Sequence, residues 1–280
     1  LFTPQAAATL GLMLPADKRA AAVAFIFIGW SIASVAGMPA GSLIAAFAGW
    51  RIAYALMAVL ALISALLVWR TLPKGLNVPT LSLSAWRAVF FDPVLILILL
   101  VTLASGSGQF TLSGYLVVIY KDVLGASPGL IALLLSGFGV AGVAGNFLAA
   151  RFVGKLGVET MIVFALGAIL LGLAVFWSSF GLLAGAAVSV ALWGLGTFSS
   201  NSLQQSRLIT HEPALASASV ALNTSTIYLG QAIGAATGAK LIAGKAFIAL
   251  APVAACFLIL AIALTLLADR FSRRRIRAQK

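Results

Sequence analysis

The chain has 280 residues, of which 62% are hydrophobic and 9% charged, and its formal net charge is +12. So apolar a composition cannot cover a water-exposed surface, which excludes a soluble globular protein. The positive charge does not indicate nucleic-acid binding, because no soluble domain is left to carry that function. Most of the surface therefore faces lipid.

Nine apolar stretches are separated by short polar gaps that hold almost every charge. About 20 apolar residues span a bilayer as a helix, in which the backbone satisfies its own hydrogen bonds. The runs lack the alternation of a membrane β-barrel, so we predict an all-α, polytopic membrane bundle. The predicted spans are 1–14, 20–47, 51–70, 93–118, 129–151, 158–178, 181–205, 214–243 and 247–268. The first is too short for a full crossing, so we expect the chain to begin inside a helix of a longer protein.

The basic residues predict how these helices are oriented. Every second gap, together with the C-terminal tail, holds most of the 18 Lys and Arg residues. Basic residues favour the cytoplasmic side of a membrane. We therefore expect a multi-pass protein of the bacterial inner membrane with a cytoplasmic C-terminus. The residues concerned are Lys18, Arg19, Arg70, Lys74, Arg87, Arg151, Lys155, Arg207, Arg270, Arg273, Arg274, Arg275, Arg277 and Lys280.

The longest polar interval divides the chain into two parts. It contains Pro73, Gly75 and Pro79 together with basic residues, which is typical of a connector. We predict the remainder of an N-terminal six-helix half at 1–71, a cytoplasmic linker at 72–91, and a C-terminal six-helix half with a basic tail at 92–280.

Three predicted helices carry small residues at every fourth position, which places them on one helical face. Two backbones can approach closely at such a face, so the pattern predicts helix–helix seams. Pro39 lies within the first of these ladders, where it removes a backbone donor and should kink its helix. The predicted seam residues are Gly29, Gly37, Pro39, Gly41, Gly137, Gly145, Gly230, Gly234 and Gly238.

Polar side chains inside the predicted spans are costly in lipid, so they indicate either a functional cavity or bonds between helices. We expect the second role for Asn146 and Ser219. The others recur at helical spacing, and we expect them to border an uncharged, amide-rich cavity. These cavity candidates are Ser105, Gln109, Ser113, Asn201, Asn223, Tyr228 and Gln231.

Motifs for other chemistry are absent from the sequence. It contains no HExxH, GxSxG or P-loop pattern and no paired acids, so we predict no enzyme, catalytic residue, metal or cofactor. No carboxylate lies in the interior of a predicted span, because Glu159 stands at the end of one, so we expect any proton site to lie outside this sequence or not to exist. The lone Cys256 gives no disulfide framework. His211 lies in a polar loop beside Glu212, so we expect it to be solvated.

Two stretches resemble the major facilitator superfamily, and within it the twelve-helix drug:proton antiporter group that includes arabinose-efflux-like permeases. The run Gly37-Met-Pro39-Ala-Gly41 is similar to a looser form of the antiporter motif in the family's fifth helix. Residues 221–238 are similar to its eleventh helix. The resemblance implies a major facilitator fold that lacks about its first three and a half helices.

By this resemblance, the three ladders fall on helices five, eight and eleven, which in the family line the contact between two halves that rock against each other. The loop between helices eight and nine departs from the family motif. Gly154 stands in place of its acid and Val158-Glu159 in place of its basic pair. These departures weaken the idea of a charge latch at this loop.

The resemblance implies a secondary active transporter that exports a small organic molecule in exchange for protons by alternating access. The uncharged cavity fits a sugar, a nucleoside or a neutral drug. A superfamily importer and a non-transporting membrane sensor or assembly subunit are the alternatives. The expected partners are a small-molecule substrate, protons and the lipid bilayer, with no nucleic acid, and we expect a monomer.

Overall fold

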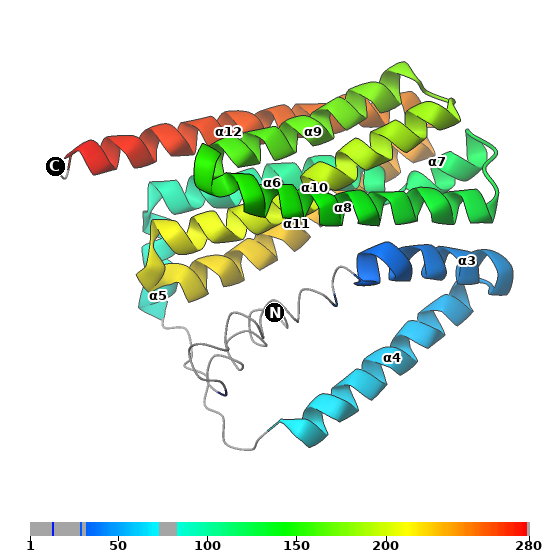
Figure 1. Cartoon of the computed structure of the whole chain (residues 1–280), viewed down its shortest axis with the longest axis horizontal. Coiled ribbons are helices and arrows are strands. Elements are labelled where there is room, and N and C mark those ends of the chain that lie inside the picture. The colour runs from blue at the N-terminus through cyan, green and yellow to red at the C-terminus, as the bar shows by residue number, and fades with distance from the viewer. Residues whose placement is uncertain (1–12, 14–28, 30–31, 73–82, 279–280) are drawn as a thin grey trace.

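The structure, a computed structural model, describes residues 13, 29, 32–72 and 83–278, and these contain no β-strand. Long helices make up most of this part of the chain (Figure 1). The predicted all-α membrane bundle is therefore confirmed. In chain order the elements are the π-helix η1 (Ala33–Gly37), α3 (Met38–Ala48), α4 (Trp50–Thr71), α5 (Leu83–Phe91), α6 (Pro93–Ser113), α7 (Leu116–Asp122), α8 (Pro128–Leu156), α9 (Val158–Ser178), α10 (Leu183–His211), the 3₁₀ turn η2 (Pro213–Leu215), α11 (Ala216–Ala243), the 3₁₀ turn η3 (Phe247–Ala249) and α12 (Leu250–Ala278).

Six segments are long and apolar enough to cross a membrane, namely α4, the combined α6 and α7, α8, α9, α10 and Phe247–Arg273. Helix α11 has 28 residues but is not among these six, because its many polar side chains lower its hydropathy. Helices η1 and α3 form a shorter apolar segment, Ala33–Ala48. Two predicted spans lie partly or almost wholly outside the described residues. Of the span 1–14 only Met13 is described, and of the span 20–47 only Gly29 and residues 32–47 are described.

Several helices extend beyond the predicted spans. Helix α8 continues to Leu156, α10 to His211 and α12 to Ala278. An apolar run ends where the hydrocarbon layer ends, but backbone hydrogen bonds continue a helix into the polar region. Hydropathy therefore underestimates helix length at these ends.

The predicted span 93–118 is interrupted after Ser113. Gly114 and Tyr115 form a turn that separates α6 from α7. The Tyr115 hydroxyl donates a hydrogen bond of 2.6 Å to the carbonyl oxygen of Ala235 in α11. This bond fixes the turn to a neighbouring helix, which a hydropathy profile cannot show.

Two pairs of consecutive helices are joined by a single glycine. Gly49 connects α3 to α4 with φ 91°, and Gly157 connects α8 to α9 with φ 83°. Positive φ angles of this size are available to glycine without a steric penalty. Each glycine therefore permits an abrupt change of direction with no intervening loop.

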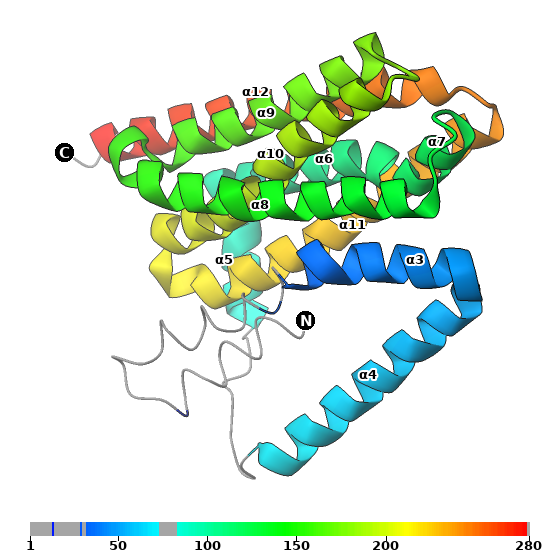
Figure 2. The same ribbon diagram turned by 45° about the vertical axis from the view of Figure 1, so that its right-hand side comes forward.

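Within the C-terminal half, α11 packs along α6, α12 packs against α6 and α9, and α10 lies against both α8 and α9 (Figures 1 and 2). The seam between α11 and α6 depends on the glycine ladder of α11. A Cβ atom at Gly230 would lie 2.7 Å from the carbonyl oxygen of Leu103, and Gly234 and Gly238 face the carbonyls of Ser107 and Thr111. No larger residue fits without separating the two helices.

A small apolar cluster closes one end of the bundle. Val89 of α5 is fully buried in it, together with Leu95, Ile98, Leu208 and Ala268. Residues 83–91 of the predicted linker therefore form a helix that packs on the C-terminal half. We call this end, which also holds the α8–α9 junction and the C-terminal part of α12, the basic end. It is the end that the sequence predicts to be cytoplasmic.

Large apolar side chains cover the outer surface of the helices. Leu62 in α4 is 73% exposed and Phe147 in α8 is 69% exposed, and many others resemble them. Helix α4 packs on α3 near its first turn and then leaves the bundle (Figure 1). Such a surface is stable in lipid rather than in water.

Replacing Gly234 with Val tests the α11–α6 seam. The added side chain collides with the α6 backbone, so we expect the free energy of unfolding to fall by about 1–3 kcal/mol. Thermal unfolding in detergent measures the change. The control is Gly167→Val in α9, where no atom lies within 4 Å of an added Cβ. Equal effects at the two positions would contradict the seam.

Candidate functional site

Helices η1 and α3 lie alongside α8 (Figure 2), where the predicted N-terminal and C-terminal halves would meet. A Cβ atom at Gly139 would lie 2.6 Å from the carbonyl oxygen of Ser34 and 2.7 Å from Cα of Val35. The backbones of η1 and α8 therefore touch directly at Gly139. The prediction had placed Gly137 in this seam, but no described atom lies within 4 Å of a Cβ at that position.

The backbone around Pro39 departs from regular α-helical geometry through a π-helical turn. The N–H of Met38 donates to the carbonyl of Ala33, five residues earlier, and Pro39 follows in the first turn of α3. π-Turns inside helices occur most often at functional sites. The irregularity expected from Pro39 thus takes the form of a widened turn beside the contact with α8.

The other predicted seam glycines divide into two groups. Gly29 and Gly41 have no described atom within 4 Å of an added Cβ, and Gly37 meets a single methyl group, that of Ala33. Their place in a seam stays a prediction. Gly145 packs on the backbone of Leu195 in α10.

Among the described residues, Gly145 and the α11 ladder therefore pack on α10 and α6. The place of Gly145, Gly230, Gly234 and Gly238 in a seam between two halves stays a prediction. A small-residue ladder indicates that a close partner exists, but its spacing does not say which helix the partner is.

Polar side chains from three helices meet in the interior of the C-terminal half. The Thr102 hydroxyl donates to Oδ1 of Asn223 over 2.7 Å. Nε2 of Gln204 donates to the carbonyl of Ile98 over 3.2 Å and to the Thr102 hydroxyl over 3.4 Å. This Thr102 cluster (Thr102, Gln204 and Asn223) therefore ties α6, α10 and α11 together.

Three of the predicted cavity residues lie in or near the Thr102 cluster. Asn223 is 1% exposed and Ser105, whose hydroxyl donates to the Thr102 carbonyl, is also buried. Gln109 is buried as well. Among the described residues these side chains lie between packed helices, and their role in lining a substrate cavity stays a prediction.

A cavity that is open to the outside lies along α10, near the basic end. It has a volume of about 400 Å³ and is lined by Ser202, Gln205, Ser206, Ile209 and Thr210. These positions recur at three- and four-residue spacing, so they share one helical face. None of the seven predicted cavity residues lines it, although the same spacing was visible in the sequence one residue beyond Asn201.

The remaining cavity candidates lie elsewhere on the bundle. Asn201 and Gln231 are half-buried and Tyr228 is 59% exposed. Ser113 is half-buried too, and its hydroxyl has no partner among the described residues. The role of these four in substrate binding stays a prediction.

One residue beside the cavity confirms a different expectation. The Ser202 hydroxyl donates to Oδ1 of Asn146 in α8 over 2.9 Å. Asn146 therefore bonds a neighbouring helix, as predicted. Ser219, for which the same was expected, instead donates to the Ala216 carbonyl of its own helix.

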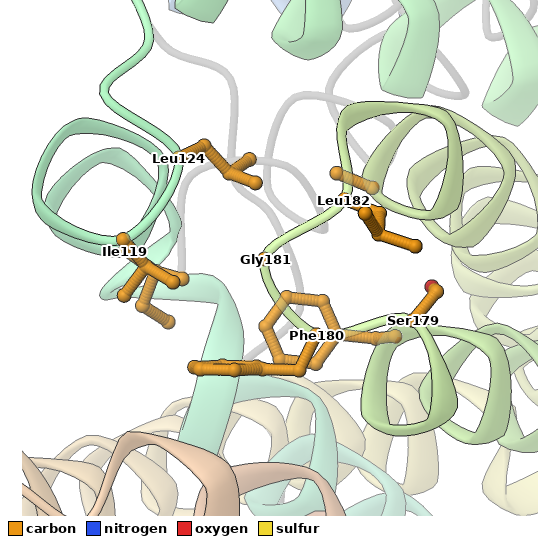
Figure 3. A pocket seen from close by; sticks show the side chains of 9 residues that line it. Ile119, Leu124, Ser179, Phe180, Gly181 and Leu182 are labelled. Atoms are coloured by element: carbon orange, nitrogen blue, oxygen red, sulfur yellow. The ribbon is translucent and has the colours of Figure 1, made fainter.

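A second, much smaller pocket lies at the opposite end of the bundle (Figure 3). Ile119 and Leu124 face the turn formed by Phe180, Gly181 and Leu182. Its volume of about 10 Å³ leaves room for at most one water molecule. This pocket is too small for an organic substrate.

Buried charges connect three helices at the basic end. Nε of the buried Arg207 lies 3.5 Å from Oε1 of Glu159, the acid in the first turn of α9. Its Nη2 donates to the carbonyl of Thr265 in α12 over 3.4 Å. The sequence does not predict this pair, because its partners lie 48 positions apart and the α8–α9 loop lacks the acid and the basic pair of the family motif.

His211 takes part in a second polar contact at the basic end. Its Nε2 atom lies 3.5 Å from Oδ1 of Asp92, and its side chain is 13% exposed. The same Asp92 oxygen accepts hydrogen bonds from the backbone N–H groups of Val94 and Leu95 at the start of α6. The expectation of a solvated histidine was wrong, since α10 continues to His211 and places its ring against α6.

The described residues contain no group of three or more His, Cys, Asp or Glu side chains that could hold a metal ion. The polar groups at the site are hydroxyls and amides, which donate and accept hydrogen bonds without a fixed charge. Such groups suit recognition of a neutral solute.

Replacing Thr102 with Val tests the Thr102 cluster. The substitution keeps the shape of the side chain but leaves the buried Oδ1 atom of Asn223 without its donor and removes one of the two acceptors of Gln204, so we expect a loss of about 1–3 kcal/mol in unfolding free energy. Thr237→Val is the matched control, because the Thr237 hydroxyl donates to Ile233 of its own helix. Thermal unfolding that is equally affected by both changes would contradict the cluster's role.

The sequence is similar to a family of known membrane proteins. The Major Facilitator Superfamily model matches residues 1–235. The chain is 29% identical over 230 residues to the inner membrane transport protein YdhP of Escherichia coli O157:H7, covering 82% of this chain and 59% of that protein. It is 28% identical over 235 residues to the "Probable sugar efflux transporter" of Helicobacter pylori (strain HPAG1), covering 81% and 58%. The chain thus spans less than two thirds of these relatives.

The fold has a solved counterpart. A bacterial homologue of the human lysosomal transporter Spinster, in an inward-facing and unoccupied conformation, superposes with a TM-score of 0.67 at 16% identity, covering 97% of this chain and 75% of that one. The likeness supports the helical arrangement. Since the family model matches well over half of its residues, the chain belongs to the major facilitator superfamily.

Proposed function

We propose that the protein is a secondary transporter of the bacterial inner membrane that exports a small neutral solute, of the sugar type, in exchange for protons. The cavity on α10 carries the proposal. Its volume of about 400 Å³ lies within the range of about 300–1,000 Å³ that small organic ligands occupy. Two relatives are named as an inner membrane transport protein and a probable sugar efflux transporter, and these names support the proposed export of a sugar.

The chemistry of the cavity supports a neutral, hydroxyl-bearing substrate. Ser202, Ser206 and Thr210 offer hydroxyls that donate and accept, and Gln205 offers an amide. No charged side chain is among the described residues that line it. An ionic substrate would leave its charge uncompensated in this part of the cavity, whereas a sugar can exchange hydrogen bonds with water for hydrogen bonds with α10.

The contact between the halves supports alternating access. Among the described residues, η1 and α3 reach the C-terminal half mainly through α8. At Gly139 this contact is made by backbone atoms of both helices. Two helices that touch through backbone atoms can change their mutual tilt without separating interlocked side chains. Rocking of one half against the other requires such a change of tilt.

Filling the cavity tests transport, direction and coupling together. Everted vesicles whose lumen is acidified by respiration should accumulate labelled sugar through the protein, and a protonophore should abolish the accumulation. We expect Ser206→Trp to reduce uptake to background because the indole occupies the cavity. Val188→Trp is the control on the same helix, since Val188 lies on the exposed face.

The alternatives give different results in this experiment. An importer would accumulate the sugar in right-side-out vesicles, in which the proton gradient has the opposite orientation. A non-transporting sensor or assembly subunit would accumulate it in neither. Unimpaired transport by the Ser206→Trp protein would show that the α10 cavity is not the pathway.

Replacing Gly139 with Leu tests the contact between the halves. The side chain collides with Ser34 and Val35, so we expect transport to be abolished while the protein still inserts in the membrane. Gly137→Leu, two residues away on the open face of α8, should retain transport. Size-exclusion profiles of both variants in detergent report insertion and folding, and equal transport by the two would refute the assignment.

A further inference from the structure

Helix α12 has one buried face and one face open to lipid. Its buried face repeats every three or four residues, and Leu258, Ala261, Thr265 and Ala268 are all fully buried on it. The opposite face is exposed and apolar. It consists of Ile259, Leu260, Ala263, Leu266 and Leu267.

The exposed face continues into a row of arginines. Helix α12 is unbroken to Ala278, so its three- and four-residue register is kept beyond the last apolar turn. After Leu266 and Leu267, the three- and four-residue steps of this face lead to Arg270 and the exposed Phe271, and then to the positions of Arg273, Arg274 and Arg277. We call these four arginine positions the arginine row. The end of α12 projects past the neighbouring helices (Figure 1).

The arginine row begins at the depth of lipid headgroups. A helix rises 1.5 Å per residue, so the backbone of Arg270 stands about 5 Å, that of Arg274 about 10 Å and that of Arg277 about 15 Å beyond Leu267. The polar layer on each side of a bilayer is about 5–8 Å thick, so Arg270 lies within it and the later arginines lie at or beyond its outer edge, where their long side chains can still reach the phosphates. The side of the helix that faces acyl chains therefore presents arginine where those chains end and phosphates begin.

The charge of this segment is strongly positive. Asp269 is the one acid among residues 269–280, and Arg273 donates to its Oδ1 atom over 2.9 Å. The Arg273 side chain is still 69% exposed. Arg270 is exposed and has no ion-pair partner among the described residues.

We propose that the arginine row binds the headgroups of anionic phospholipids in the leaflet at the basic end of the bundle. Arginine pairs with phosphate through its planar fork of donors. Clusters of basic residues next to a membrane span attract anionic lipids. Lipid is the occupant that the register selects, because the row continues a face already turned to acyl chains.

The test compares two neutralised variants of the purified protein in nanodiscs. One carries R270Q/R274Q/R277Q, which leaves the Arg273–Asp269 pair intact. The other carries R87Q/R151Q/K155Q, which removes the same charge from exposed positions of the basic end outside α12. Native mass spectrometry counts the phosphatidylglycerol and phosphatidylcholine molecules retained after extraction from equimolar discs.

We expect the unmodified protein and the second variant to retain phosphatidylglycerol in preference to phosphatidylcholine by about tenfold, and the first variant to lose most of this preference. R270K/R274K/R277K should restore much of it, since it restores the charge. Equal loss in both neutralised variants, or no preference in the unmodified protein, would overturn the proposal and leave the row as a topological anchor.

A second measurement covers the case in which the first variant does not insert. Phosphatidylglycerol with a photoreactive headgroup is cross-linked to the unmodified protein, and the adducts are mapped by peptide. Adducts concentrated in residues 266–280 support the proposal. Adducts spread evenly over the polar segments of the basic end would overturn it.

Discussion

Close approach of helix backbones is the constraint on which this structure depends. In lipid, apolar side chains gain little by leaving their surroundings for one another, so helices associate through packing density. Glycine supplies it along α11, where Gly230, Gly234 and Gly238 lie against carbonyls of α6. The same device at Gly139 brings η1 against α8. The seam between α11 and α6 holds the C-terminal helices together, and the contact between η1 and α8 joins residues 32–48 to them through a small surface.

Polar atoms are arranged according to the same constraint. Where helices pack closely, polar groups are enclosed and linked to one another, as Thr102 is with Asn223 and Gln204. Along the second half of α10, Ser202 bonds Asn146 of α8, and a cavity lined by the α10 side chains lies beside this bond. Hydroxyls and amides therefore have two roles here, bonding helices together and lining a cavity, and the packing around them decides the role rather than the residue type.

This explains how far the sequence could predict the structure. The spans were predictable because long apolar runs have one stable state in lipid. The seam on α11 was predictable because three glycines share a face. The helix that packs on this seam was not predictable, since a glycine ladder allows any helix to approach closely. Asn223 was assigned to a cavity and lies in a cluster, because spacing along α11 carries no information about α10. The pairs Arg207–Glu159 and His211–Asp92 join residues distant in sequence and depend on where helices end.

The single glycine between α8 and α9 has a mechanical consequence. One residue contributes two soft dihedral angles, so the hairpin has no slack and its arms cannot slide independently. A displacement of α8 at Gly139 would therefore also move Gly157 and the first turn of α9. In that turn Glu159 lies 3.5 Å from Arg207 on α10. The hairpin thus connects the contact between η1 and α8 to the ion pair between α9 and α10.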